Sequence, residues 1–145
     1  MSWTQRYKQA HNDWVKRTNP VYFDAAGGDT MKVSYPCVTK SNGLTSAICK
    51  FLEWEGHRAT RINTAGRIVN GRYITSTTRK GTADISATIK GRAIMIEIKV
   101  GKDRPSEYQL AEQQRERNAG GIYEFIHSID EFFLFYDNFI LILNK

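Results

Sequence analysis

The sequence of 145 residues predicts a single α/β domain in which a mixed β-sheet is flanked by helices. Two observations favour this class. Segments whose apolar residues recur at helical spacing alternate with short segments that are rich in β-branched residues. The composition, with 41% hydrophobic and 12% aromatic residues, supplies side chains for one sizeable core and excludes a disordered chain.

The N-terminal quarter predicts one helix followed by an arm. Residues 3–17 are a polar, Trp-bearing segment that favours a helix ending before Asn19-Pro20. Residues 18–41 are interrupted by Gly, Pro and Ser and predict an extended arm or loop. We therefore separate an N-terminal helix and extended arm, residues 1–41, from the main domain, residues 42–145.

The main domain is expected to begin with an amphipathic helix and two strands. A helix is predicted over residues 44–55, because apolar residues recur there at helical spacing, and Gly56 provides the stop. Residues 58–63 and 72–78 are rich in β-forming residues and predict strands. The turn-like dipeptides between them are Ala65-Gly66 and Asn70-Gly71. The helix should pack its apolar face on the sheet.

A β-hairpin is predicted over residues 83–90 and 93–100, with Gly91-Arg92 as its two-residue turn. Alternation along the second strand places Glu97 and Lys99 on one face, whereas the other face is apolar throughout. Taken alone, two opposite charges on such a strand are most often a partly exposed ion pair at a sheet edge.

Asp84, near the start of the hairpin, changes that interpretation. The turn places Asp84 near the Glu97 end of the partner strand, and two adjacent carboxylates repel each other unless a cation lies between them. Oxygen ligands suit Mg²⁺ or Mn²⁺. Lys99 then stands beside the metal, where it can orient or deprotonate an attacking water and stabilise the charge that develops on phosphorus. The arrangement favours a phosphodiester hydrolase.

The C-terminal third predicts a helix, a strand and a second helix. Ser106-Glu107-Tyr108-Gln109 and Ser128-Ile129-Asp130-Glu131 have the form of capping boxes that open the two helices. Gly120-Gly121 ends the first helix, and residues 122–127 predict the strand. The second helix carries aromatic residues spaced for burial against the sheet: Phe132, Phe133, Phe135, Tyr136 and Phe139. If some of these rings are exposed, a homodimer interface is the next interpretation.

The distribution of charge points to a polyanionic partner. The formal net charge of +6 is concentrated in residues 58–104, which hold eleven Lys or Arg and three Asp or Glu, a net of +8. This basic segment is either a solvated, arginine-rich sheet face or a phosphate-binding surface. Four bases at its turns and strand ends are expected to hold nucleic-acid phosphates, or else to be ordinary surface charge: Arg67, Arg72, Arg79 and Lys80.

Several classes of protein are disfavoured by what the sequence lacks. Cys37 and Cys49 form no metal-binding pair, and the three histidines have no zinc-site spacing. There is no GxxxxGK[ST] phosphate loop and no GxSxG nucleophile motif. The N-terminus lacks the apolar core of a signal peptide, and the longest apolar stretch is too short to cross a bilayer. We therefore expect a reduced, cytoplasmic protein with no membrane partner.

The motif Gly81-x-x-Asp84, followed by Glu97-Ile98-Lys99, resembles the core of the PD-(D/E)XK nucleases. The wider pattern is similar to their VRR-NUC branch, the small nuclease domains of phages and DNA-repair proteins. Four further pieces agree with that branch in order: the helix 43–55 with its Gly56 stop, Arg61-Ile62-Asn63, Ser106-Glu107-Tyr108-Gln109 and Ala119-Gly120-Gly121. The resemblance covers about residues 42–127.

This resemblance implies a restriction-endonuclease-like fold with an α-β-β-β-α-β core, in a protein encoded by a phage, a prophage or a bacterial host. It also implies that Asp84, Glu97 and the backbone carbonyl of Ile98 bind Mg²⁺ or Mn²⁺. Lys99 then serves the attacking water, and Gln109 supports the site. Residues in further supporting positions are Asn42, Arg61 and Asn63, the last two on a strand face that is either part of the site or a solvated polar face.

Two residues depart from the family pattern. Ala83 replaces the usual proline before the aspartate, which leaves the acid itself in place. Asn42 stands where the first helix of the family usually has a glutamate that completes the metal site, so the metal affinity is expected to be weaker. Glu53 and Glu55 are either substitutes for that glutamate or, in the interpretation we favour, surface acids at the far end of the helix.

The sequence thus predicts a metal-dependent endonuclease that hydrolyses DNA phosphodiester bonds. Two alternatives stay open. One is a non-catalytic nucleic-acid-binding module on the same scaffold, which predicts salt-sensitive binding without Mg²⁺-dependent cutting. The other is a structural or assembly protein that dimerises through the aromatic C-terminal helix and is poorly retained on DNA.

Overall fold

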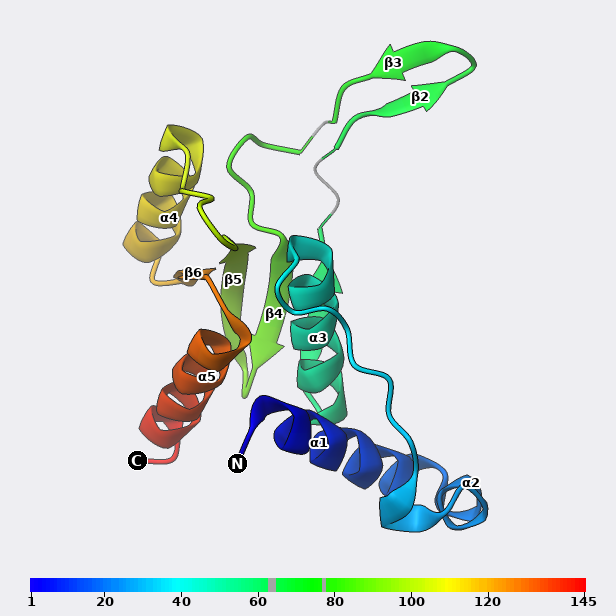
Figure 1. Cartoon of the computed structure of the whole chain (residues 1–145). Helices are drawn as coiled ribbons and strands as arrows, with labels where there is room; N and C mark the ends of the chain where they lie inside the picture. The colour runs from blue at the N-terminus through cyan, green and yellow to red at the C-terminus, as the bar shows by residue number, and fades with distance from the viewer. Residues whose placement is uncertain (63–64, 77) are drawn as a thin grey trace.

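A four-stranded mixed sheet with helices on both faces forms the centre of the protein (Figure 1). The computed structural model describes residues 1–62, 65–76 and 78–145. Its elements are α1 (Trp3–Thr18), α2 (Pro20–Ala25), the 3₁₀ turn η1 (Gly28–Thr30), α3 (Ser41–Trp54), β1 (Arg58–Arg61), β2 (Arg67–Val69), β3 (Arg72–Ile74), β4 (Ile85–Ile89), β5 (Arg92–Ile98), α4 (Glu107–Asn118), β6 (Ile122–Ile126) and α5 (Ile129–Leu143). No helix in these ranges has the length and apolar character needed to span a membrane.

The sheet has the strand order β1-β4-β5-β6. The β1/β4 and β4/β5 pairs are antiparallel, whereas β5 and β6 are parallel and are connected through α4. A parallel pair needs such a crossover, which the capping box at Ser106 and the following helix provide. Leaving aside the separate β2–β3 pair, the chain runs α3-β1-β4-β5-α4-β6, in the α-β-β-β-α-β order expected from the sequence.

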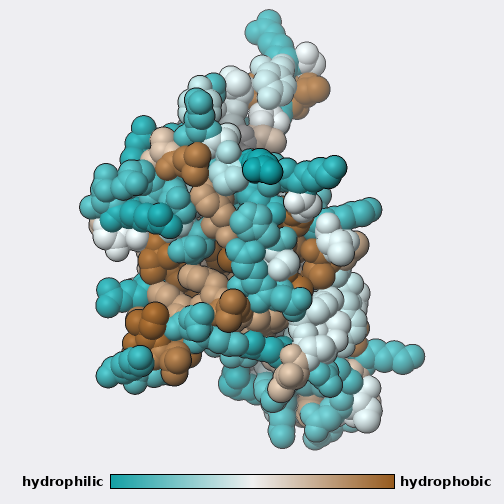
Figure 2. Space-filling view, turned by 60° about the vertical axis from the view of Figure 1, so that its left-hand side comes forward, coloured by the Kyte–Doolittle hydropathy of each residue, from teal (hydrophilic) through white to brown (hydrophobic). Residues whose placement is uncertain are grey.

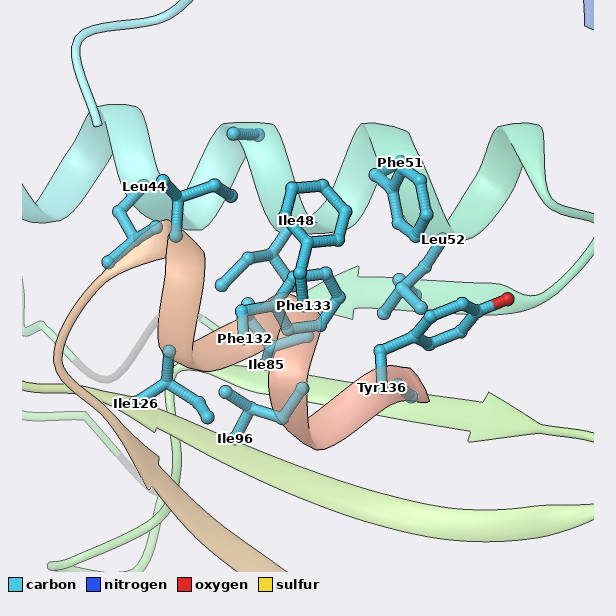
Figure 3. Packing of buried hydrophobic residues seen from close by; sticks show 14 of the residues in the cluster. Leu44, Ile48, Phe51, Leu52, Ile85, Ile96, Ile126, Phe132, Phe133 and Tyr136 are labelled. Carbon is cyan, nitrogen blue, oxygen red and sulfur yellow. The ribbon is translucent and has the colours of Figure 1, made fainter. Parts of the chain in front are cut away.

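The core lies between one face of the sheet and the helices α3 and α5 (Figure 3). Ile94, Ile96 and Ile98 of β5 alternate onto this face and are at most 2% exposed. The rings of Phe51 on α3 and Phe133 on α5 meet edge to face, with centroids 4.8 Å apart. Other residues packed here are Leu44, Ile48, Leu52, Ile85, Ile126, Phe132 and Tyr136, with Phe135 and Phe139 half-buried at the margin. The predicted apolar face of helix 44–55 is confirmed.

The N-terminal helix α1 packs on the same core. Tyr7 and Ala10 are buried among the core residues, and Tyr7 stacks edge to face on Trp54 at the end of α3, 4.7 Å between ring centroids. The Arg6 guanidinium forms a bidentate ion pair with Asp137 of α5, with both N–O distances 2.7 Å. This helix therefore packs against both α3 and α5.

Three local expectations from the sequence need correction. The segment expected to be an extended arm contains α2, which begins where Asn19 caps it and Pro20 occupies the first turn. The turn of the β4–β5 hairpin is Lys90-Gly91, both at positive φ, and not Gly91-Arg92. At α5, Ser128 caps the helix, but the Glu131 carboxylate accepts from the His127 N–H, so the reciprocal bond of a capping box is absent there.

The largest difference concerns residues 65–76. The sequence predicts one strand over residues 72–78, whereas the structure has a separate two-stranded ribbon of β2 and β3 joined by the turn Asn70-Gly71. Figure 1 shows this β2–β3 ribbon extending away from the sheet, beyond the end at which α3 begins. The chain termini lie at the opposite end of the molecule.

Tyr7 provides a test of the core. Its side chain is fully buried, and its hydroxyl has no hydrogen-bond partner among the described residues. Because a buried hydroxyl without a partner costs free energy, Tyr7→Phe should leave the free energy of unfolding unchanged or raise it by about 1 kcal/mol. Tyr7→Ala should lower it by about 3–5 kcal/mol, since a large cavity remains. Urea denaturation followed by circular dichroism measures both, and a clear loss of stability in Tyr7→Phe would contradict this packing.

Candidate active site

Asp84 and Glu97 lie together because of the antiparallel pairing of β4 and β5. Ile85 pairs with Ile96, so the two acids meet one position beyond that pair. The Ile98 N–H donates to Asp84 Oδ2 at 2.9 Å, and the Asp84 carbonyl accepts from the Ile62 N–H at 2.7 Å. Asp84 is therefore held between β5 and the chain that follows β1. Since the N–H and C=O of a strand residue point to the same neighbour, the Ile98 carbonyl also faces Asp84.

Glu97 is a buried carboxylate, only 5% exposed. Gln109 Nε2 donates to Glu97 Oε1 at 2.6 Å, whereas Glu97 Oε2 is buried without a hydrogen-bond partner among the described residues. Burial, with a smaller contribution from the neighbouring Asp84 carboxylate, raises the pKa of Glu97 to about 7. The expected proximity of the two acids is confirmed. Two charged carboxylates at these positions repel each other when no cation is bound.

Lys99 lies beside Glu97 and is 6% exposed. Its Nζ is 3.5 Å from Glu97 Oε1 and 3.5 Å from Asp103 Oδ2, so the ammonium stands between two carboxylates. Asp103 was not expected from the sequence to take part in the site, although its i+4 spacing from Lys99 was available as a signal. Asp103 also borders an open hollow lined by residues 101–105 and His127, which carries the bases Lys102 and Arg104.

The start of α4 positions Gln109. Ser106 and Gln109 form the predicted capping box, in which the Ser106 N–H donates to Gln109 Oε1 at 2.9 Å. The Gln109 side chain thus caps the helix through its oxygen and binds Glu97 through its nitrogen. Gly81, at φ +85°, lies so close to the backbone of Tyr108 that a Cβ would collide with it. This contact explains the glycine three residues before Asp84.

Tyr123 is a further supporting residue that sequence reasoning missed. Its ring is fully buried on β6, and its hydroxyl donates to the Gly81 carbonyl at 2.9 Å. Burial, and then the Glu97 and Asp84 carboxylates, raise the pKa of Tyr123 well above its usual range. Tyr123 therefore stays protonated and ties the loop before Asp84 to β6.

Asn42 and Arg61 also lie at this end of the sheet. Arg61 Nη2 donates to Asn42 Oδ1, which links the first turn of α3 to the end of β1. The Asn42 oxygen is thus bound by a guanidinium, and both side chains are exposed. Asn63, the third expected supporting residue, lies outside the described residues. Glu53 and Glu55 are exposed at the far end of α3, as expected.

The four bases expected to hold phosphates are all exposed. Arg67 and Arg72 belong to the β2–β3 ribbon, whereas Arg79 and Lys80 lie in the loop before β4. Arg79 is 3.6 Å from the Glu112 carboxylate, and Lys80 lies over the Tyr108 ring, 5.1 Å from its centroid. The loop bases thus face the first turns of α4, close to Gln109.

A divalent cation fits the residues that are present. The buried Glu97 oxygen, which has no partner in the part of the chain that the structure describes, and the raised pKa of Glu97 both indicate a place where added positive charge would be stabilising. No group of three or more His, Cys, Asp and Glu side chains converges in the described ranges. Two carboxylates and a backbone carbonyl nevertheless suit Mg²⁺, which keeps several of its waters in protein sites.

Comparison of the sequence with protein-family models and with curated proteins finds no match.

The raised pKa of Glu97 predicts a pH dependence of stability in the metal-free protein. A carboxyl group whose pKa rises from 4.5 to about 7 on folding binds more protons in the folded state, so it lowers stability progressively as pH increases through that window. Glu97→Gln removes this effect. We expect the free energy of unfolding of Glu97→Gln, relative to wild type, to increase from pH 5 to pH 8, measured by urea denaturation in EDTA. A constant difference across this range would show that Glu97 is not desolvated in this way.

Proposed function

We propose that the protein is a metal-dependent nuclease that hydrolyses DNA phosphodiester bonds, with the restriction-endonuclease-like fold of the PD-(D/E)XK nucleases. One observation carries the proposal. Asp84 and Glu97 are held together at a strand end, one Glu97 oxygen is buried without a partner among the described residues, and the buried Lys99 stands beside them. Two adjacent acids in a buried position lower the stability of a fold, so stability alone does not explain their presence.

Asp84, Glu97 and the carbonyl of Ile98 are the residues that would hold Mg²⁺ or Mn²⁺. When bound, the ion would supply positive charge that stabilises the phosphate transition state and lowers the pKa of the attacking water. Gln109 fixes the Glu97 carboxylate by a charge-assisted hydrogen bond. In the proposed function Gln109 therefore orients Glu97, a residue that would bind the metal, and does not itself contact the substrate.

Lys99 has the role of directing the nucleophile and balancing charge. Its ammonium is held between Glu97 and Asp103, 3.5 Å from a carboxylate oxygen of each. From this position it can donate hydrogen bonds to the attacking water and to a non-bridging phosphate oxygen. The exposed bases of the basic segment that lie near this end of the sheet, among them Arg61, Arg79 and Lys80, would attract the nucleic-acid backbone toward it.

The order α3-β1-β4-β5-α4-β6 and the mixed sheet support the fold assignment. The site lies at the sheet end where Figure 1 shows the starts of α3 and α4 and the end of β5. This is the place at which the resemblance puts the acids and the lysine.

Cleavage of DNA tests the proposal. Wild-type protein should cut duplex or branched DNA in the presence of Mg²⁺, and Glu97→Gln and Lys99→Ala should each lower the rate by at least about 100-fold, because each removes charge from the reacting centre. Glu53→Gln is the matched control, since Glu53 is an exposed acid on α3 away from the site. Gel analysis of end-labelled DNA measures the rates.

The catalytic assignment is wrong if wild type cuts no form of nucleic acid, or if Glu97→Gln and Lys99→Ala cut as fast as Glu53→Gln.

Asn42 favours the second candidate, a nucleic-acid-binding module without catalysis, because its amide brings no negative charge to the site and its oxygen is already bound by Arg61. Calorimetric titration with Mn²⁺ separates the two functions. A nuclease should bind Mn²⁺ in a manner that Glu97→Gln abolishes and Glu53→Gln preserves. Absence of Mn²⁺ binding in wild type, together with salt-sensitive DNA binding, would establish the module instead.

A further inference from the structure

The β2–β3 ribbon exposes apolar side chains that no described helix or strand covers. Among the described helices and strands, β2 and β3 contact each other and no other element. Ile68 and Tyr73 nevertheless pair across one face and are 74% and 68% exposed. Val69 and Ile74 on the opposite face are exposed as well. Apolar side chains that do not pack in the core contribute little to folding, so they are available to a partner.

The charge of the ribbon identifies the kind of partner. From Gly56 to Ala83 the sequence holds six Arg or Lys residues and no Asp or Glu. Two of them, Arg67 and Arg72, belong to the ribbon and share the face opposite to Ile68 and Tyr73. An arm that is positively charged and free of acids is complementary to a polyanion.

The shape of the ribbon selects among polyanions. Its strands are joined by the tight turn Asn70-Gly71, with both residues at positive φ, so its tip is only two strands wide. The major groove of B-form DNA, about 12 Å wide, admits a two-stranded β-ribbon. The major groove of A-form RNA is too narrow and deep for side chains to read. In Figure 2 the ribbon stands out at the top of the molecule, with hydrophobic and hydrophilic side chains side by side.

We propose that the β2–β3 ribbon is an arm that enters the major groove of duplex DNA and holds the duplex over the sheet end that carries Asp84 and Glu97. Arg67 and Arg72 contact the phosphates that flank the groove, whereas Ile68 and Tyr73 contact base edges and thymine methyl groups. This inference rests on the proposed function and specifies its substrate: the cleaved DNA must have an intact duplex segment on the ribbon side of the site.

Binding measured without cleavage tests the arm. Fluorescence anisotropy in EDTA compares a DNA duplex, an RNA duplex of the same sequence and a single strand. Wild type should bind the DNA duplex most tightly. Arg67→Ala/Arg72→Ala should reduce the slope of log K against log salt by about 2, at about 0.9 per lost phosphate contact. Ile68→Ser/Tyr73→Ser should lower the affinity for the DNA duplex about tenfold without changing that slope.

The control variant is Lys50→Ala/Lys145→Ala, which removes the same charge from exposed positions outside the ribbon and should bind nearly as wild type does. Because the ribbon contacts no other described element, all variants should keep the thermal midpoint of wild type. Ribbon variants that bind the DNA duplex as tightly as the control would overturn the proposal. So would an equal loss for DNA duplex, RNA duplex and single strand, which indicates charge alone.

A second copy of the chain is the competing occupant. If light scattering shows that wild type is a dimer and that Ile68→Ser/Tyr73→Ser is a monomer, the ribbon is a subunit interface and the proposal is wrong. The failure of this proposal and that of the nuclease are distinguishable. Ribbon-independent binding leaves Mg²⁺-dependent cleavage intact, whereas loss of the nuclease proposal leaves the binding comparison in EDTA unaffected.

Discussion

The register of the β4–β5 hairpin is the constraint on which the candidate site depends. Pairing of Ile85 with Ile96 places Asp84 beside Glu97 on one side of the chain and Ile96 in the core on the other. A shift by one residue would turn the apolar face of β5 toward α4 and the acids toward α3 and α5. Burial of the isoleucines therefore fixes the two carboxylates in place, and the stability of the core is what holds two repelling charges together.

Local helix structure serves the same site. The oxygen of Gln109 caps α4, while its nitrogen binds Glu97. The close approach of Gly81 to the first turn of α4, and the hydrogen bond from Tyr123, join the loop before Asp84 to the same helix end. Each acid is thus positioned by a helix or strand that packs in the fold. These contacts keep the two side chains in one geometry. The Asp103 carboxylate, on the other side of Lys99, holds the Lys99 side chain in place in the same way.

The sequence predicted the parts of this arrangement that follow from short-range rules. Strand alternation placed Glu97 and Lys99 on one face, and the Ser106 capping box placed Gln109 at a helix start, because both patterns need only neighbouring residues. Tyr123 was missed because its role depends on a contact across the fold. Asp103 was missed, although it is only four residues from Lys99, because the turn at residues 101–102 that brings it back to Lys99 was not predicted. The β2–β3 ribbon was misread because three-residue strands exposed on both faces have no hydrophobic period. The engagement of Asn42 by Arg61 likewise depends on packing of α3 against β1.

The proposed function requires that Asp84, Glu97 and the Ile98 carbonyl bind a divalent metal ion. A crystal structure of the protein grown with Mn²⁺, with anomalous diffraction data recorded at the manganese edge, would show whether they do. An anomalous peak in contact with both carboxylates and the carbonyl is expected in wild type, and it should be lost in Glu97→Gln. A well-ordered site without such a peak, with Glu97 still paired to Lys99 and Gln109, would contradict the proposed function.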